Sequence, residues 1–439
     1  MTALASPGTC RPCSKSELAY NAMPYTQTVI TDNYNVYCGP QSTISEHAPL
    51  TFEIPGSEAD FTDLSNTFLK LRLKVTTAAG EDVTDANAPA LSLSNNVLNT
   101  LFSQVDVTLN DTLVSQSSNL HGYRAYVENL LSYTSLAKKS FLKVEGFCPD
   151  TAGHFDNPAQ NGGHAERRKW ITDGKELELL GRIHSDLFHT DLLIPNGVTI
   201  KLTLTPAKTT FVLTSHDAQP PDFALQITHA SLEVRKVKLA PKEQLRIEQA
   251  LVKTGLQLPL THSTVKSFAI PSGVSQFDIE NLVSGQIPSR ILLGLVSDEA
   301  LNGTLSKNPF KFDHYDLNFL ALHVGGRQLP ARPLQPDFGK GEFLDCYTTL
   351  FSNLGGYGAS NHDLTTADYI GGNTLYCFNL TPDGGDGVSH LSPRTAGQVR
   401  ASLHFARNLP STAALFVYCQ YDNILTIDRY RNVVFDFAS

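Results

Sequence analysis

Alternation of apolar and polar residues is the dominant pattern along this chain. It is clearest in five segments, residues 69–75 (LKLRLKV), 105–109 (VDVTL), 198–204 (VTIKLTL), 232–239 (LEVRKVKL) and 399–405 (VRASLHF). A period of two places one side of a strand on a core and the other side in solvent, as in antiparallel sandwiches and barrels. Helical periodicity is rare and is best at residues 123–133 and 241–251. The pattern therefore predicts a mainly β protein.

A second pattern is a set of landmarks that recur at a shift of roughly 215 residues. Five pairs follow one another in the same order: FEIP from Phe52 with FAIP from Phe268, the strand ends Leu109 and Val324, YVENLLSY from Tyr126 with YTTLFSNL from Tyr347, Gly181 with Gly397, and Ile194-Pro195 with Leu409-Pro410. Turn pairs suited to a tight hairpin follow both Leu109 and Val324. We interpret this order as one fold present in two copies, in which Phe52 superposes on Phe268 and Leu109 on Val324.

The two copies predict an all-β double jelly roll, which is two tandem eight-stranded antiparallel β-sandwiches with short helices in the loops and the linker. The expected division is an N-terminal arm at 1–39, a first jelly roll at 40–239, a linker helix at 240–259 and a second jelly roll at 260–439. The arm mixes Pro, Gly, Ser and charge, so we expect it to be ordered only against a neighbour.

Two long loops are rich in Gly, Asn, Asp and Ala, at residues 148–169 and 352–397. Long connections of a sandwich cluster at its ends and often carry contacts with partners. We expect these loops to lie together at one end, to form an outer surface and to be the first sites of limited proteolysis.

Charge and composition exclude several classes of function. The formal net charge is −9, and no block of basic residues is longer than the three at 167–169, so tight binding to nucleic-acid phosphates is disfavoured. The start has no apolar signal region and no uncharged apolar run reaches 18 residues, so we expect neither a cleavable signal nor a membrane span. Seven scattered cysteines favour a reducing compartment over a disulfide framework.

Candidate chemistry is sparse. Cys10 and Cys13 have a metal-like spacing but no second ligand pair, and the turn at 383–387 lacks the further acidic ligands of a calcium loop. His184 and His189 lie five residues apart in or beside a strand, which predicts opposite faces and no shared ligand site. Trp170, beside two arginines, is a weak candidate for an interface anchor. No nucleotide-binding or serine-hydrolase motif occurs, so we predict no enzyme activity and no catalytic, cofactor or metal residues.

Several stretches resemble one known family. They are residues 52–75, residues 95–133 (NNVLNTLFSQVDVTLNDTLVSQSSNLHGYRAYVENLLSY) and residues 418–437 (YCQYDNILTIDRYRNVVFDF). They are similar to the double jelly-roll major capsid proteins of Polinton (Maverick) elements and adintoviruses, distant relatives of adenovirus hexon. The resemblance implies homotrimeric, pseudo-hexagonal capsomers that tile an icosahedral shell around double-stranded DNA. It implies no catalytic residue and no cofactor.

Two hypotheses from different classes follow. The first is a self-assembling capsid subunit, whose partners are further copies of itself, penton proteins and minor capsid or cement proteins, without sequence-specific contact to nucleic acid. Its location would be the virion, after synthesis in the host cytoplasm and with nuclear assembly left open. The alternative is a carbohydrate-binding or catalytic β-sandwich, which explains only the all-β pattern. A trimer favours the first hypothesis, and a glycan-binding monomer favours the second.

Overall fold

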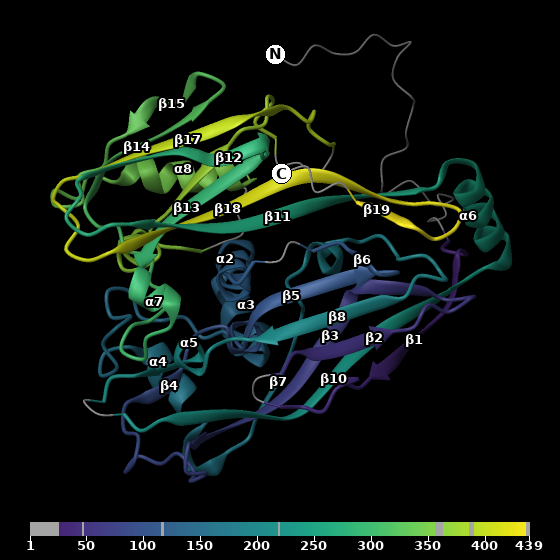
Figure 1. The fold of residues 1–439 in the computed structure, drawn as a ribbon, viewed down its shortest axis with the longest axis horizontal. Coiled ribbons are helices and arrows are strands. Elements are labelled where there is room, and N and C mark those ends of the chain that lie inside the picture. Colours follow the sequence, from purple (N-terminus) through teal and green to yellow (C-terminus); the bar gives the residue numbers. More distant parts are fainter. Residues whose placement is uncertain are drawn as a thin grey trace, which may run out of the picture.

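The computed structural model describes residues 26–45, 48–115, 118–217, 220–355, 363–385 and 390–435. Two antiparallel β-sandwiches lie side by side, with the first half of the chain in one and the second half in the other (Figure 1). The observed sandwiches confirm the predicted all-β fold with short helices.

The first sandwich has two four-stranded sheets, with strand orders β1-β10-β3-β7 and β2-β8-β5-β6 among the described residues. Its strands are β1 (Ile30–Cys38), β2 (Leu50–Ile54), β3 (Phe61–Thr77), β5 (Phe102–Leu109), β6 (Thr112–Leu113), β7 (Leu177–Gly181), β8 (Ile200–Pro206) and β10 (Phe223–Leu239). A small separate ladder joins β4 (Leu91–Leu93) to β9 (Leu213–Ser215). In each sheet the second strand comes from late in the half and lies between two earlier strands, which is the jelly-roll arrangement.

The second sandwich repeats this order, with sheets β11-β18-β13-β16 and β12-β17-β14-β15. Its strands are β11 (Leu256–Ile270), β12 (Gln276–Gln286), β13 (Arg290–Ser297), β14 (Leu317–Val324), β15 (Arg327–Leu334), β16 (Leu375–Asn379), β17 (Ala396–Phe405) and β18 (Ala413–Ile427). A short strand, β19 (Val433–Phe435), pairs with the end of β18. Each strand of these two sheets therefore has a counterpart at the same place in the first sandwich.

The landmarks that suggested this duplication are equivalent only in part. Leu109 and Val324 end β5 and β14, which occupy the same place in the two sandwiches. Phe52, however, lies in β2, the second strand of its sandwich, while Phe268 lies in β11, the first strand of the other. The predicted superposition of Phe52 on Phe268 is therefore wrong.

Two other landmark pairs are displaced by one strand in the opposite direction, so that the member in the second half lies one strand later than its partner in the first half. Gly181 ends β7 and Gly397 lies in β17, while Ile194 precedes β8 and Leu409 precedes β18. The cause is that connections of different length separate the strands of the two copies. The segment between β6 and β7 is much longer than the one between β15 and β16. A constant shift along the sequence therefore cannot match every strand with its counterpart.

Short helices occupy the connections. They are α1 (Val97–Thr100), α2 (His121–Ser132), α3 (Ser135–Lys139), α4 (Gly162–Arg168), α5 (Thr209–Val212), α6 (Pro241–Thr254), α7 (Asp298–Asn302), α8 (Leu344–Gly355) and α9 (Thr366–Ile370), with 3-10 turns η2 (Phe141–Glu145), η3 (Thr172–Gly174) and η4 (Asp186–His189). The linker helix α6 begins with a proline at its first turn and ends at Gly255, whose φ of 73° favours glycine. The helices α2 and α8 lie in equivalent connections of the two sandwiches.

The predicted N-terminal arm needs a correction. Residues 1–25 lie outside the described residues, but residues 30–38 form β1, which pairs antiparallel with β10 from Leu239 to Leu232. Although most of β1 is exposed, its backbone completes a sheet of the first sandwich. The boundary at residue 39 is therefore wrong, because residues 30–38 belong to the first sandwich. They have no core of their own and are ordered by backbone pairing with a neighbouring strand.

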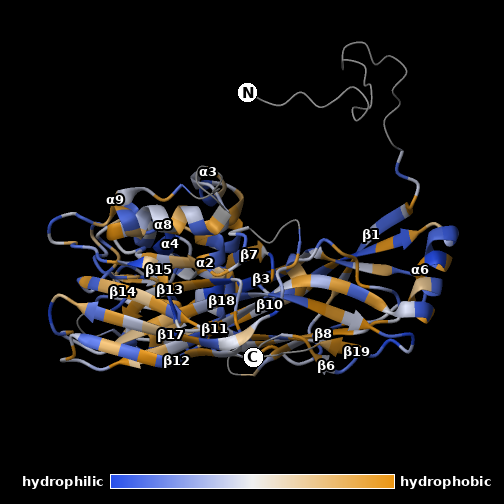
Figure 2. Cartoon of the chain, turned by 90° about the horizontal axis from the view of Figure 1, so that it is seen from above, coloured by the Kyte–Doolittle hydropathy of each residue, from blue (hydrophilic) through white to orange (hydrophobic). Residues whose placement is uncertain are grey.

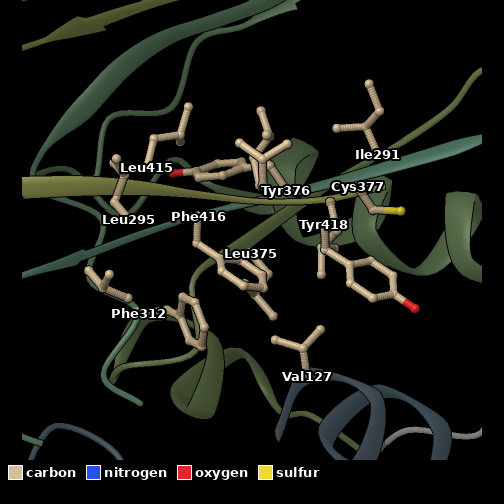
Figure 3. Packing of buried hydrophobic residues seen from close by; sticks show 14 of the residues in the cluster. Val127, Ile291, Leu295, Phe312, Leu375, Tyr376, Cys377, Leu415, Phe416 and Tyr418 are labelled. Atoms are coloured by element: carbon tan, nitrogen blue, oxygen red, sulfur yellow. The ribbon is translucent and has the colours of Figure 1, made fainter. Parts of the chain in front are cut away.

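The two sandwiches share their cores. Side chains of α2 belong to the apolar cluster of the second sandwich, namely Tyr123, Tyr126, Val127 and Leu130. Figure 3 shows Val127 facing Leu375 and Phe416 of that sandwich. In return, the cluster of the first sandwich includes Leu258, Leu425, Ile427 and Val433 from the second half. This exchange of side chains fixes one sandwich against the other.

The loops at 148–169 and 352–397 are close together, but they are not equally exposed. Gly153 donates its backbone N–H to the Gly371 oxygen at 2.7 Å. In the first loop, however, Phe155 and Arg167 are buried. The expectation that this loop forms an exposed surface is therefore wrong for these residues. Residues 356–362 and 386–389 of the second loop lie outside the described residues.

Candidate functional site

A polar pocket of about 250 Å³ lies where α2 meets the second sandwich. Figure 1 shows α2 between the two sets of sheets. Residues of both halves line the pocket, among them Arg124, Glu128, Asp186 and His189 from the first half and Ser263, Tyr418, Gln420 and Asp422 from the second. Such a concentration of ionisable groups at an internal junction is the most distinctive polar site among the described residues.

Arg124 lies at the centre of this site. Its Nε donates to Glu128 Oε1 at 2.9 Å, one helical turn later in α2, and its second terminal nitrogen donates to Asp186 Oδ1 at 2.6 Å. The side chains of Arg124, Glu128 and Asp186 are 11%, 15% and 2% exposed. One guanidinium therefore holds two nearly buried carboxylates, which is the arrangement that its fork of donors favours.

The same carboxylates bind the second sandwich. Asp186 lies 2.6 Å from His262 Nδ1 and accepts the backbone N–H of Ser263 at 3.1 Å, and both of these residues belong to β11. The Tyr418 hydroxyl of β18 donates to Glu128 Oε1 at 3.0 Å. The network therefore connects α2 and η4 with two strands of the other half.

Electrostatics keeps both carboxylates charged. Burial alone would raise the pKa of Glu128, but Arg124 and His184 outweigh it and hold that pKa well below its usual range. Burial opposes ionisation of Asp186 in the same way, and Arg124 and His262 lower its pKa. The side chains around both carboxylates thus hold them in their ionised form.

The prediction that His184 and His189 lie on opposite faces is wrong. The strand β7 ends at Gly181, and the chain then turns into η4, so the alternation of a strand does not apply to these residues. His184 Nδ1 lies 2.5 Å from Glu128 Oε2, and His189 Nε2 lies 3.6 Å from the same oxygen. Ligand atoms of the three side chains all lie within 4.8 Å of one another.

The other sequence candidates do not join this site. Cys10 and Cys13 lie outside the described residues, as do residues 386 and 387 of the acidic turn. Asp383 of that turn accepts the backbone N–H of Gly385 at 3.1 Å and lies 2.6 Å from His390 Nε2. Trp170 is half-buried and packs against the core of the first sandwich, which is a structural role.

Sequence reasoning missed the carboxylates of the pocket. The spacing of Arg124 and Glu128 on the expected helix was the available signal, because residues four apart share a helix face. Nothing local in the sequence indicated that Asp186 and Tyr418 would join them, since they are separated from α2 by long stretches of chain.

No protein-family model matches the chain. An uncharacterized protein of Caenorhabditis elegans is 26% identical over 427 residues, which cover 94% of this chain and 99% of that protein. Among the described residues, no helix is long and apolar enough to cross a membrane.

Solved structures are similar over nearly the whole chain. A chain of the Sputnik virophage has a TM-score of 0.68 at 12% identity and covers 100% of this chain and 96% of its own length. The Faustovirus major capsid protein has a TM-score of 0.63 at 8% identity, with coverages of 95% and 93%. The mavirus major capsid protein has a TM-score of 0.52 at 12% identity, with coverages of 98% and 97%. At these identities the likeness establishes the fold, so the chain has the double jelly-roll fold of these viral capsid proteins.

Proposed function

We propose that this chain is a major capsid protein whose homotrimers form pseudo-hexagonal capsomers that tile an icosahedral shell around double-stranded DNA. One observation carries the proposal: two complete jelly rolls with the same strand order follow one another in a single chain. Major capsid proteins of Faustovirus and mavirus have this fold over almost their entire length.

The duplication has a geometric use in a shell. Three chains with two similar lobes each approximate six-fold packing, and a closed ring leaves no unpaired interface of the same kind. A six-lobed unit needs lobes that are fixed relative to each other. The exchanged core side chains of α2 and β18 provide this rigidity.

An exposed apolar surface offers a contact for further copies of the chain. On α3 and η2, Leu136, Phe141 and Val144 are 76%, 53% and 48% exposed. Leu344 of α8 and Ile370 of α9 are also exposed, and Figure 2 shows α3, α8 and α9 along one side of the molecule. Large exposed apolar side chains that gather on one side are typical of protein interfaces. We place the trimer contact on this helical side.

The remaining features of the proposal follow from this role. With a net charge of −9, the chain has little electrostatic reason to bind DNA, so other components would neutralise the packaged genome. Penton and minor capsid or cement proteins would be its partners in the virion. We keep the Polinton and adintovirus relationship, and the division into two jelly rolls joined by a linker at 240–259, as part of the proposal.

Trimer formation is the direct test. After purification with nuclease treatment, light scattering at moderate salt should give a mass of about three times the 47.9 kDa of one chain. The interfaces of such an obligate trimer are expected to bury more than roughly 2,000 Å², so dilution should not dissociate it. A stable monomer, or a trimer that dissociates when nucleic acid is removed, would contradict the proposal. A monomer that binds glycans would favour the carbohydrate-binding alternative.

The position of the contact is tested by Leu136→Glu. A carboxylate at this site would be buried between two copies without a partner, so the measured mass should fall from three chains to one. Leu245→Glu is the matched control, because Leu245 is 60% exposed on α6 at the other end of the molecule (Figure 2). It should retain the trimer mass. If Leu136→Glu also remained trimeric, the contact would lie elsewhere.

A further inference from the structure

Glu128, His184 and His189 form a cluster that the proposed capsid role does not use. Glu128 comes from α2, His184 from the turn after β7, and His189 from the end of η4. Two segments of the chain, α2 and the connection after β7, thus converge at the wall of the polar pocket. Among the described residues, this is the group of three His, Cys, Asp or Glu side chains whose ligand atoms lie within 4.8 Å of one another.

The chemistry of the donors suits a first-row transition metal. Two imidazoles and one carboxylate are the protein ligands of many open zinc sites, in which a water takes the fourth position. With bonds of about 2.1 Å, a tetrahedral zinc ion holds its ligand atoms roughly 3.4 Å apart. His189 Nε2 and Glu128 Oε2 already have nearly this separation, at 3.6 Å.

A second pair of ligand atoms has to separate before an ion can bind. His184 Nδ1 and Glu128 Oε2 are hydrogen-bonded at 2.5 Å, so a metal between them requires these atoms to separate by about 1 Å. A neutral imidazole carries its single proton on either ring nitrogen. With the ring proton on Nε2, the lone pair of His184 Nδ1 is available to a metal ion.

Access and charge also favour a cation. The side chain of His189 is 39% exposed, so an ion can reach the cluster from the pocket. The carboxylates of Glu128 and Asp186 lie at this site with one guanidinium, that of Arg124, and carboxylate oxygens are accepted ligands of divalent cations. Arg124 and Tyr418 bind Glu128 through Oε1, which leaves Oε2 directed at the histidines. These outer partners orient the carboxylate as second-layer groups do in metal sites.

We propose that Glu128, His184 and His189 bind one divalent transition-metal ion, of the zinc class, at the junction of the two jelly rolls. The ion connects α2 with η4, and both elements bind the second sandwich through Tyr418 and Asp186. Metal binding therefore stabilises the arrangement of the two lobes.

The test uses the untagged full-length chain, freed of metal with a chelator and titrated with Zn²⁺ by calorimetry. Wild type should bind one equivalent per chain, and Zn²⁺ should raise its melting temperature. His189→Gln removes one ligand from a partly exposed position, so it should fold and weaken Zn²⁺ binding by more than about 100-fold, the upper end of what loss of an outer partner costs. The matched control is His229→Gln, because His229 is an exposed histidine of β10 outside the cluster, and it should bind as wild type does.

Either of two results would overturn the proposal: no saturable binding by wild type, or equal binding by wild type and His189→Gln. If His189→Gln did not fold, Co²⁺ titration of wild type decides the question. The visible absorption of four-coordinate Co²⁺ supports the site, and the spectrum of hydrated Co²⁺ alone overturns it. The proposed capsid function is tested separately, since trimer mass is measured without added metal.

Discussion

Replacing Tyr126 with Ala is expected to lower the free energy of unfolding by about 3–5 kcal/mol, the range for removal of a large aromatic side chain from a core. The ring is fully buried and stacks on Phe310 with centroids 4.3 Å apart and an interplanar angle of 11°. It also lies 5.8 Å from Phe147. Since Tyr126 belongs to α2 and Phe310 to the second half, the cavity would open between the two lobes.

Urea unfolding at a fixed chain concentration checks this expectation. Trp170 is the single tryptophan and packs on the first sandwich, so its fluorescence reports that half, while circular dichroism reports both. Because the cores are shared, Tyr126→Ala should lower the urea midpoint by the same amount in fluorescence and in circular dichroism.

The control is Tyr126→Phe, which keeps the ring and loses only the 3.3 Å hydrogen bond to Asn373. It should cost about 1 kcal/mol or less. A similar loss of unfolding free energy in both variants would show that the stacked ring does not stabilise the contact between the two sandwiches. A lower urea midpoint in circular dichroism, with an unchanged midpoint in fluorescence, would show that the halves unfold independently.

The strands and their faces could be predicted from the sequence because alternation is local. The segment at 69–75 alternates, and in β3 its leucines are buried while its lysines and arginine are more exposed. Each jelly roll repeats such half-buried strands, so the fold class follows from a pattern that any short window contains.

The pairing of copies and the polar site depend on contacts that no local window contains. Phe52 and Phe268 have similar neighbours in sequence but occupy different strands, because loop lengths decide which strand a residue reaches. His184 and His189 meet at Glu128 because the chain leaves β7 at Gly181 and turns. A period of two assumes that the strand continues, and the sequence has no strong signal for its end.

The basic run at 167–169 shows the same limit for charge. In sequence it is the longest basic block, and the expected role of such residues is at the surface. In the structure Arg167 is buried, while Lys169 is exposed. The partner of Arg167 is Asp150, which lies 17 residues earlier, and Asp150 also accepts from Asn308 of the second half. Charge patterning therefore disfavoured tight binding to nucleic-acid phosphates but could not identify a buried ion pair.

Replacing Arg167 with Met is expected to destabilise the chain by about 3–5 kcal/mol, the cost of removing one partner from a buried ion pair. Both side chains of the pair are buried, with 1% exposure for Arg167 and 0% for Asp150, at a distance of 2.7 Å. The guanidinium also donates to the backbone oxygens of Leu93 at 2.8 Å and Cys148 at 2.6 Å. Met fills a similar volume but donates nothing, so Asp150 would lose its cationic partner and two carbonyl groups would lose a donor inside the protein. Asn161 and Asn308 would still donate to Asp150.

The matched control for this prediction is Arg246→Met, because the side chain of Arg246 is 77% exposed and forms its ion pair with Glu243, three residues earlier on α6. Its free energy of unfolding should change by no more than about 0.5 kcal/mol. Trp170 follows Arg167 by one turn, and its backbone N–H donates to the Arg167 oxygen at 3.2 Å, so urea unfolding followed by its fluorescence measures the loss of stability close to the substituted residue.

If the double variant Arg167→Met/Asp150→Asn recovers part of the stability, the unpaired carboxylate is the main cause. Equal stability of Arg167→Met and Arg246→Met would show that the ion pair contributes nothing and that the loop at 148–169 is held by its apolar contacts alone.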